Sequence, residues 1–347
     1  MRDLVVAGGG PVGMAAALHA HRAGLDVVVR EPRPGPIDKA CGEGLMPGAV
    51  AELAALGVAP RGHDIAGIRY LSADGAGPGV SARFDAGPGR GVRRTVLHAA
   101  LADQLAAAGV PVEARPVRDV RPRADHVEVD GERARYLVAA DGLHSPTRRL
   151  LGLDDDARGG RRRFGLRCHV RQQPWSPFVE VHWSAHAEAY VTPVDDDLVG
   201  VAILTDAGQD FDDALAGFPV LRERLVGERT RVRGAGPLRQ RVRARASGRV
   251  LLVGDAAGYV DALTGEGIAL GLAQARAAVA CLAAGRPDHY EQQARRIGRR
   301  QEALTHALLA ATGRPVVRRL LVPAAERLPW VFSTAVNQLA RPIEVPA

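Results

Sequence analysis

The sequence of 347 residues predicts an α/β fold with a helical tail, and three observations support that prediction. Near the N-terminus, a short apolar run leads through a glycine-rich turn into a segment of helical character, as in a unit with a buried parallel strand. Residues 165–204 instead alternate like consecutive antiparallel strands, followed by a helix predicted over residues 211–226. From residue 291 onward the chain is helical and amphipathic, with breaks at prolines.

The first turn has the spacing of a dinucleotide-binding site. Apolar residues 4–7 precede Gly8, Gly10 and Gly13, which fit the pattern G-x-G-x-x-G. The first glycine permits a tight turn, the second lets the backbone approach a pyrophosphate, and the third lets the next helix pack closely. The helix predicted over residues 13–23 therefore presents its free N–H groups to an anion.

A second predicted strand, over residues 25–29, is followed by Glu31. An acidic side chain at this position suits the two hydroxyls of an unphosphorylated ribose. Its charge disfavours a 2′-phosphate, so NADP is not expected in this turn.

Two later motifs complete a set. Residues 140–148 contain D-G-x-x-S-x-x-R, beginning at Asp141, and residues 250–258 contain a strand followed by Gly254 and Asp255. In this order, the three motifs resemble those of the p-hydroxybenzoate hydroxylase-like flavoproteins, which include aromatic monooxygenases, flavin halogenases and geranylgeranyl reductases. The resemblance covers roughly residues 1–290 and implies that FAD is the cofactor.

The resemblance also implies roles for individual residues. Asp255 would bind the ribityl or ribose hydroxyls, Arg94 would lead a helix and touch the cofactor, and Val117 would stack on adenine. The helix opened by residues 264–268 would lie beside the pyrimidine ring, where its N–H groups stabilise the negative charge of reduced flavin. The predicted FAD contacts are Gly8, Gly10, Pro11, Val12, Gly13, Glu31, Arg94, Val117, Asp141, Gly254, Asp255, Gly265, Gly267 and Ile268.

The family fold implies a discontinuous Rossmann-like FAD-binding domain with an inserted antiparallel β-sheet substrate domain. The FAD-binding domain is expected at residues 1–60, 92–162 and 240–290. The substrate domain is expected at residues 61–91 and 163–239, and the helical tail at 291–347.

One strand of the substrate domain holds candidate substrate contacts. Residues 188–193 read E-A-Y-V-T-P, where flavin halogenases carry W-x-W-x-I-P and geranylgeranyl reductases Y-x-W-x-F-P. Aligned on the proline, Glu188, Tyr190 and Thr192 share one face of the strand and line the pocket above the flavin. Glu188 is then a candidate base or substrate anchor and Tyr190 a wall. The alternative is that Glu188 lies in solvent and the intervening residues face the pocket.

The loop at residues 38–47 contains C-G-E-G, beginning at Cys41, as in geranylgeranyl reductase-like proteins, where it passes near the flavin. Cys41 is therefore a candidate catalytic residue, although a reactive thiolate requires a cationic neighbour. The alternative is a small buried cysteine in a packed loop.

These motifs predict an FAD-dependent oxidoreductase. Monooxygenation of a hydrophobic or aromatic small molecule is favoured, with NADH or NADPH as transient reductant and dioxygen as co-substrate. Reduction of an isoprenoid or conjugated double bond is the first alternative, and a non-catalytic flavin-binding protein is the second. Halogenation is not expected, because the resemblance implies that a halogenase needs a lysine beyond the C-G-E-G segment, whereas Lys39 precedes that segment and no other lysine exists.

Composition argues against other classes. The net charge is +7, from 45 arginines and one lysine against 39 acidic residues. The arginines are dispersed and aromatic residues make up 4%, so no nucleic-acid partner is expected. The cysteines at 41, 168 and 281 lie far apart and the histidines show no ligand spacing, so no metal is expected.

No signal-peptide pattern and no apolar run of ~18 residues is present, so we expect a cytoplasmic protein. Residues 315–322 and 328–332 mix arginines with bulky apolar side chains. Packing of this tail over the FAD-binding domain is expected, and contact with a membrane surface is the alternative.

Overall fold

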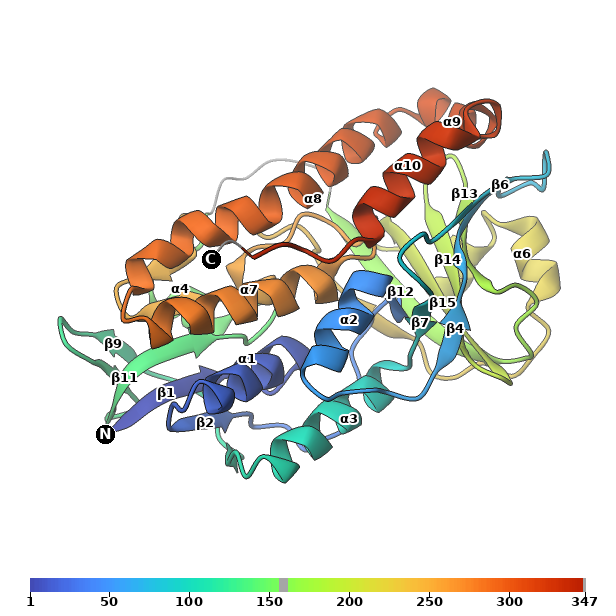
Figure 1. The fold of residues 1–347 in the computed structure, drawn as a ribbon. Helices are drawn as coiled ribbons and strands as arrows, with labels where there is room; N and C mark the ends of the chain where they lie inside the picture. The colour runs from blue at the N-terminus through green and yellow to red at the C-terminus, as the bar shows by residue number, and fades with distance from the viewer. Residues whose placement is uncertain (156–161, 346–347) are drawn as a thin grey trace.

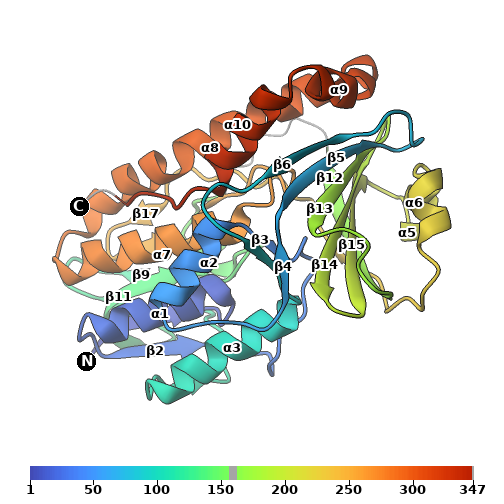
Figure 2. The same cartoon turned by 45° about the vertical axis from the view of Figure 1, so that its right-hand side comes forward.

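The computed structural model describes residues 1–155 and 162–345 as two sheet-based halves that lie side by side, with the C-terminal helices along one side of both (Figures 1 and 2). The predicted FAD-binding segment 92–162 and the predicted tail 291–347 each include residues outside these two ranges. The predicted fold class is confirmed: the structure is mixed α/β, with two large sheets and a helical tail.

The first half is built on a mostly parallel sheet. Its strands are, in spatial order, β17 (Ala246–Ser247), β18 (Val250–Leu252), β11 (Glu132–Ala139), β1 (Arg2–Ala7), β2 (Val27–Arg30) and β8 (Val112–Glu113). A hairpin of β9 (Val120–Pro122) and β10 (Val127–Val129) continues from β11. The strands β18, β11, β1, β2 and β8 pair in parallel, and β17 is antiparallel. The apolar side chains of β1 are fully buried, as expected of a central parallel strand.

Helices cover this first sheet. One apolar cluster joins β1 and β2 to five helices: α1 (Pro11–Arg22), α2 (Pro47–Ala55), α3 (Arg94–Ala107), α7 (Gly267–Ala283) and α8 (Tyr290–Thr312). The short helix α4 (Pro146–Leu150) follows β11. Proline occupies the first position of α1, α2 and α4, where its missing N–H costs no helical hydrogen bond.

The second half is an almost entirely antiparallel sheet. Its order is β16 (Arg233–Ala235), β12 (Arg163–Arg171), β15 (Leu198–Asp206), β14 (Glu188–Asp195), β13 (Phe178–Trp183), β5 (Gly67–Ser72) and β6 (Val80–Arg83). Among the described strands of this sheet, only β13 and β5 pair in parallel. A small sheet of β3 (Gly44–Leu45), β7 (Gly89–Gly91) and β4 (His63–Ile65) lies where the chain passes between the halves.

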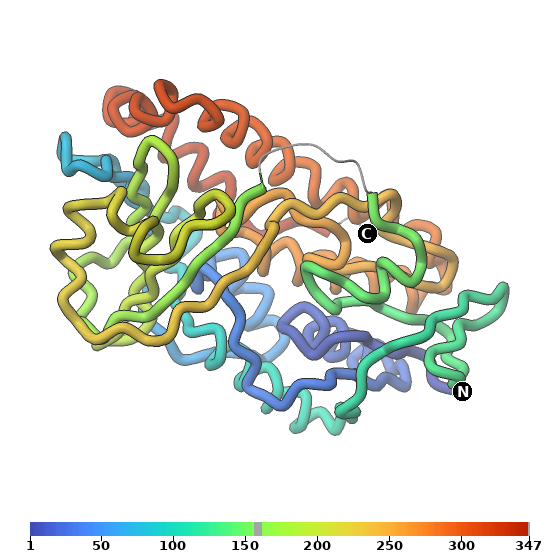
Figure 3. Tube along the Cα trace, turned by 180° about the vertical axis from the view of Figure 1, so that it is seen from behind, coloured from blue at the N-terminus to red at the C-terminus, as the bar shows by residue number. Residues whose placement is uncertain are grey.

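The helix predicted over residues 211–226 is wrong as a single helix. The structure has α5 (Phe211–Leu215) and α6 (Pro219–Arg224), separated at Phe218. Proline 219 lacks the N–H that a continuous helix would need there, so it begins a new helix instead. After α6 the chain runs back along the sheet toward the first half, as the view from behind shows (Figure 3).

The tail consists of α8 (Tyr290–Thr312), α9 (Pro315–Arg327) and α10 (Pro329–Ala340). α8 lies against α7, α9 and α10 lie over the second sheet, where Val322, Phe332 and Val336 are buried, and Ile343 after α10 packs against the apolar cluster of the first half. The prediction that residues 315–322 and 328–332 pack over the FAD-binding domain is therefore wrong, because α9 and α10 cover the second sheet instead. The opposite side of α9 and α10 exposes apolar side chains: Val316, Leu320, Leu328, Trp330 and Val331. None of the helices in the described part of the chain is both long and apolar enough to span a membrane.

Candidate active site

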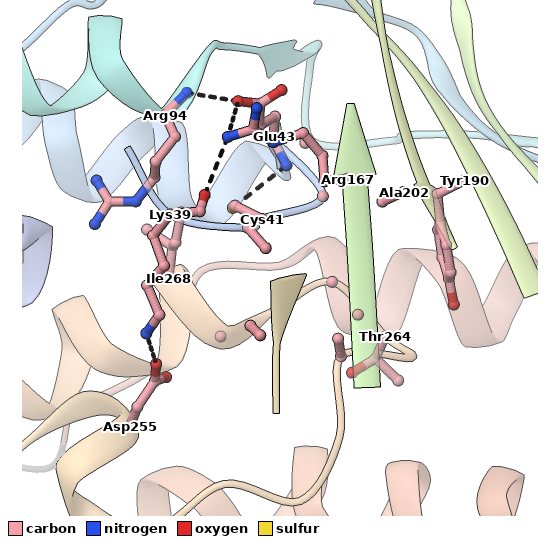
Figure 4. A pocket seen from close by; sticks show the side chains of 18 of the residues that line it. Lys39, Cys41, Glu43, Arg94, Arg167, Tyr190, Ala202, Asp255, Thr264 and Ile268 are labelled. Atoms are coloured by element: carbon pink, nitrogen blue, oxygen red, sulfur yellow. Dashed lines mark hydrogen bonds and ion pairs between the residues drawn. The ribbon is translucent and has the colours of Figure 1, made fainter. Parts of the chain in front are cut away.

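A cavity of about 500 Å³ lies between the two halves, and both contribute to its lining (Figure 4). Toward the first half it is bordered by polar and charged groups: Arg33, Lys39, Glu43, Arg94, Asp141 and Asp255. The second sheet adds the buried Arg167 of β12 beside Glu43 at this charged end. Its other side chains at the cavity are mostly apolar, among them Ile68, Val179, Val181 and Leu204, and Ile65 and Leu263 from neighbouring segments add to this apolar lining. Leu308 of α8 and Val336 and Leu339 of α10 close the apolar part. The cavity therefore has a charged end and an apolar end.

The glycine turn borders the charged end. A Cβ on Gly13 would lie 1.9 Å from the Gly8 carbonyl oxygen, and one on Gly8 would lie 2.5 Å from the Ala140 oxygen. A Cβ on Gly10 would instead meet only the Arg94 guanidinium, at 3.8 Å. Gly10 also lines the cavity, so the turn leaves open space on the side where a pyrophosphate would approach.

Arg94 supplies an unsatisfied cation beside that space. Its guanidinium is buried, and Nη1 has no hydrogen-bond partner among the described residues. A buried cation without a partner is costly. An anionic group bound at the Gly10 turn would satisfy Arg94, so the residues present fit a dinucleotide.

Glu31 lies behind the turn and does not line the cavity. Its carboxylate accepts the Gly9 N–H at 2.9 Å and pairs with Arg33 at 2.8 Å. Burial favours a higher pKa for Glu31, but the hydrogen bonds from Arg33 and Gly9 outweigh it and hold the pKa below its usual value. The side chain is thus an anion at neutral pH, as its predicted ribose-binding role requires.

The other two motifs meet at the same end. Asp255 pairs with Lys39 at 3.0 Å, as Figure 4 shows. Asp141 accepts the Thr147 N–H at 2.9 Å through one oxygen, while its other oxygen is buried without a partner among the described residues. The buried Arg148 donates to the Ala256 carbonyl at 3.1 Å and so ties these motifs together.

The remaining predicted FAD contacts divide into two groups. The cavity is lined by Pro11, Val12, Gly265, Gly267 and Ile268, in addition to those described above. Outside the lining are Gly8, Gly13, Glu31, Val117 and Gly254. Val117 packs in an apolar cluster with Val5 and Val28, behind the first sheet.

The C-G-E-G loop is held by Glu43, which the sequence analysis did not select. Glu43 has a φ of 61° and is buried. One carboxylate oxygen accepts the Arg94 backbone N–H at 2.8 Å, and the other contacts His169 Nε2 at 2.7 Å. Glu43 thus joins the start of α3 to strand β12 across the two halves. In the sequence, Glu43 could have been recognised as the charged residue among the small residues of this segment.

Cys41 lines the cavity, and its Sγ accepts the Glu43 N–H at 3.4 Å. Burial raises the pKa of the Cys41 thiol, and the opposing effect of Arg94 is smaller. The thiol is therefore protonated at neutral pH, so Cys41 is not a reactive thiolate here.

On β14, Tyr190 and Thr192 line the cavity, whereas Ala189 and Val191 pack on the opposite face of the sheet. The Tyr190 hydroxyl donates to the Leu263 carbonyl at 2.8 Å, and the Thr192 hydroxyl donates to the Gly42 carbonyl at 2.8 Å. Both side chains therefore brace loops of the first half while they border the cavity.

Glu188 departs from its predicted place. It shares the face of Tyr190, but it does not line the cavity and is fully buried. Its carboxylate pairs with Arg163 of β12 and with Arg318 of α9, the latter at 2.6 Å. The tail, which the strand pattern could not reveal, covers this end of β14 and converts the expected base into part of a buried ion-pair cluster.

Comparison with known proteins identifies the cofactor. A family model described as "FAD binding domain" matches residues 1–198. The chain belongs to this FAD-binding family. It is an FAD-dependent oxidoreductase, and its cofactor is FAD. Among the described residues, no group of three or more His, Cys, Asp or Glu side chains could hold a metal ion.

Named relatives include reductases. The chain is 33% identical over 328 residues to a menaquinone reductase of Mycolicibacterium smegmatis, covering 83% of this chain and 78% of that protein. It is 27% identical to digeranylgeranylglycerophospholipid reductase 1 of Methanothermobacter thermautotrophicus, covering 78% of this chain and 74% of the relative.

Solved structures share the fold at low identity. A triple mutant of a flavin-dependent brominase has a TM-score of 0.82 at 17% identity, over 98% of this chain and 95% of that chain. The p-nitrophenol 4-monooxygenase of Pseudomonas putida has a TM-score of 0.76 at 20% identity, with the same coverage. At these identities the likeness concerns the fold alone.

Proposed function

We propose that this FAD-dependent oxidoreductase saturates a carbon–carbon double bond in an isoprenoid chain. The observation that carries the proposal is the apolar end of the cavity, which extends from the sheet to Leu308 and Leu339 of the tail helices. Burying an aliphatic chain there is favourable in proportion to its apolar area. Two relatives are named reductases, one of a menaquinone and one of a geranylgeranyl lipid, and prenyl chains are common to both kinds of molecule.

The residues present fit the reaction. Bound FAD in its reduced form would supply a hydride to one alkene carbon, and a proton must reach the other carbon, so that the alkene gains two protons and two electrons in all. The protonated Cys41 thiol lines the cavity, and we assign proton donation to it. Water then returns a proton to Cys41. NADH or NADPH is proposed as the hydride donor that restores reduced FAD.

Monooxygenation, which the sequence alone favours, is the second candidate. The D-G-x-x-S-x-x-R segment beginning at Asp141 supports it through the family resemblance. In that reaction dioxygen would supply one oxygen atom to the substrate and one to water, with electrons from NADH or NADPH. The apolar cavity accommodates such a substrate as well. Halogenation is not proposed, because the single lysine, Lys39, is paired with Asp255.

The test separates these reactions by product mass. Holoenzyme is reduced anaerobically with NADH, NADPH or dithionite and incubated with menaquinone in detergent, and the quinone is reoxidised in air before mass spectrometry. A lasting gain of two hydrogen atoms supports reduction of the chain, since a reduced ring would reoxidise. Oxygen incorporation from labelled dioxygen in an aerobic reaction would replace the proposal with monooxygenation. The Cys41→Ser variant is expected to keep FAD but to form product at least about tenfold more slowly.

A further inference from the structure

The outward side of α9, together with the turn into α10, gathers exposed apolar side chains. Of the eleven large apolar side chains that are exposed in the described part of the chain, five lie in residues 316–331, so they are concentrated rather than scattered. Isolated exposed apolar residues are ordinary, whereas a concentration of them marks an interaction surface. We call this group the tail surface, and its members are Val316, Leu320, Leu328, Trp330 and Val331.

The helical period divides α9 into two sides. Val316 and Leu320 stand four residues apart and are therefore neighbours on the outward side, and Arg327 returns to that side two turns later. The other side carries Arg318 and Val322, which are buried where α9 contacts β5, β6 and β13. The inward side thus already serves the fold, and the outward side is left for a partner.

Arginines flank the tail surface, with little negative charge among them. Arg314, Arg319 and Arg327 are exposed, and within the described ranges none of them has an ion-pair partner. Between residues 303 and 343 the chain carries one acidic side chain, Glu326, whose carboxylate accepts the Gly79 N–H at 2.8 Å. The tail surface therefore joins apolar contact to uncompensated positive charge.

That combination favours a membrane surface over a second copy of the chain. An anionic membrane offers phosphate charge at its surface and acyl chains just beneath it, so it matches both parts of the tail surface. In a symmetric pair, two copies would place the same arginines against each other, and like charges oppose such a contact. Trp330, which is 70% exposed, adds a side chain of a type that is enriched at membrane interfaces.

The helices that carry the tail surface also close the apolar end of the cavity. Leu308 of α8 and Leu339 of α10 line that end. Leu308 belongs to the same apolar cluster as Leu321 and Val322 of α9, which directly follow Leu320. Figures 1 and 2 show these three helices together along one outer edge of the molecule. A membrane bound at the tail surface therefore lies next to the helices that border the proposed binding space of an isoprenoid chain.

We propose that the protein binds peripherally to an anionic membrane through the tail surface. The three flanking arginines contact lipid phosphates, and the apolar side chains of the tail surface enter the layer just below them. This binding is independent of the proposed reaction. Only the supply of an isoprenoid substrate from the membrane rests on the proposed function.

The binding test is flotation of the holoenzyme with lipid vesicles in a density gradient. Vesicles of phosphatidylglycerol and phosphatidylcholine in equal parts are compared with vesicles of phosphatidylcholine alone. We expect at least about tenfold more protein to float with the anionic vesicles, and we expect about 1 M salt to release it, because salt screens exposed charges.

The apolar contribution is tested with the double variant Leu320→Ser/Trp330→Ser, which should lower the affinity for anionic vesicles about tenfold. Both side chains are exposed, so the urea midpoint of unfolding should not change. The matched control is Val112→Ser/Val226→Ser, which alters two apolar positions outside the tail that are 56% and 80% exposed. We expect this control to bind the vesicles like the wild type.

The charge contribution is tested with three substitutions at once. Arg314→Gln, Arg319→Gln and Arg327→Gln together remove three positive charges and should weaken the binding at least about tenfold. The control removes the same net charge from exposed arginines elsewhere: Arg222→Gln, Arg231→Gln and Arg286→Gln. An equal loss in the control would mean that the net charge of the whole protein, and not the tail surface, causes the binding.

The depth of the contact is tested through the fluorescence of Trp330. Vesicles with brominated acyl chains quench a tryptophan that touches those chains. The other tryptophans belong to the second half, where Trp183 is buried and Trp175 donates its ring N–H to Glu180. We expect bromine to quench the wild type, and we expect Trp330→Phe to lose most of that quenching while it still floats with the vesicles. Equal quenching of both proteins would contradict the entry of Trp330 into the membrane.

Two results overturn the proposal. One is a wild-type holoenzyme that does not float with anionic vesicles, and the other is a loss of flotation that is equal in the tail variants and in their controls. If Leu320→Ser/Trp330→Ser unfolds at a lower urea concentration than the wild type, the comparison of bromine quenching with Trp330→Phe decides instead.

The competing partner and the proposed function have separate outcomes. A dimer that Leu320→Ser/Trp330→Ser converts to a monomer, with flotation unchanged, would overturn the proposal and assign the tail surface to contact between copies. A holoenzyme that floats but forms no reduced product overturns the proposed function alone. Reduced product without flotation overturns the membrane contact alone.

Discussion

The two sheets bury different chemistry. In the first sheet, β1 and β18 bury apolar side chains, Arg30 of β2 is buried in ion pairs, and the proposed cofactor site is made by backbone at the strand ends. In the second sheet, β12, β13 and β14 bury charged groups, among them Arg163, Arg167, Glu180 and Glu188. The proposed cofactor site in the first half therefore depends on open space around glycines. The second half depends more on buried ion pairs, which join segments that are distant in the sequence.

This difference predicts different failures. A change in the first half is expected to remove the cofactor and leave the fold, because the cofactor occupies space that the protein leaves open. A change in the second half is expected to weaken the fold and leave the cofactor turn, because a stranded buried charge costs folding free energy.

The largest expected effect on the cofactor is that of Gly10→Val. Its side chain fills the space beside the turn, where a Cβ meets only Arg94, so FAD binding is lost while the apoprotein loses about 1 kcal/mol or less. Flavin absorbance after gel filtration and urea unfolding of the apoprotein measure the two effects. The control is Gly234→Ala, whose Cβ makes an ordinary contact with Leu166. Full FAD content in Gly10→Val would contradict the placement of the cofactor.

On stability, the largest effect belongs to Glu188→Ala. The change leaves Arg163 and Arg318 buried without their shared carboxylate, at an expected cost of about 3–5 kcal/mol in unfolding free energy. Urea unfolding of the apoprotein measures it, with the exposed Glu223→Ala as control, for which a change within about 0.5 kcal/mol is expected. A loss of unfolding free energy below about 1 kcal/mol would show that this ion-pair cluster does not stabilise the contact between the second sheet and the tail.

At the boundary between the halves, Glu266 predicts a pH dependence. Burial at the start of α7 raises its pKa from 4.5 in the unfolded chain to about 8 in the folded protein. Between these values the unfolded state releases a proton that the folded state keeps, so stability falls with rising pH by about 1.4 kcal/mol per pH unit from this group. Glu266→Gln removes that contribution, and its stability relative to the wild type should rise across this window. Parallel curves for the two proteins would contradict the raised pKa.

The smallest effect is that of Asp255→Ala on FAD affinity. Losing a charge-assisted hydrogen bond to the cofactor hydroxyls is expected to weaken binding by about 1–3 kcal/mol, with little change in the fold. Fluorescence titration of the apoprotein with FAD measures it, and the exposed Asp288→Ala is the control. Equal affinities for both variants would remove Asp255 from the proposed contacts.

The predictability of each region follows from the same contrast. The glycine turn and its strand and helix could be predicted because a few consecutive residues determine their backbone. The fate of Glu188 could not, because its partner Arg318 lies in the tail and only tertiary packing brings the two together. Glu43 was missed for the same reason, since its partner His169 belongs to the other half. The break between α5 and α6 was predictable from Pro219 alone.

Lys39 makes the cofactor site chemically addressable. It carries the only side-chain amine among the 347 residues, and it is paired with Asp255 at the charged end of the cavity. An amine-reactive reagent therefore has a single side-chain target, placed where the cofactor is proposed to bind. The extent of acylation at Lys39, measured by mass spectrometry, would report whether the cavity is occupied, because a bound cofactor would shield the amine.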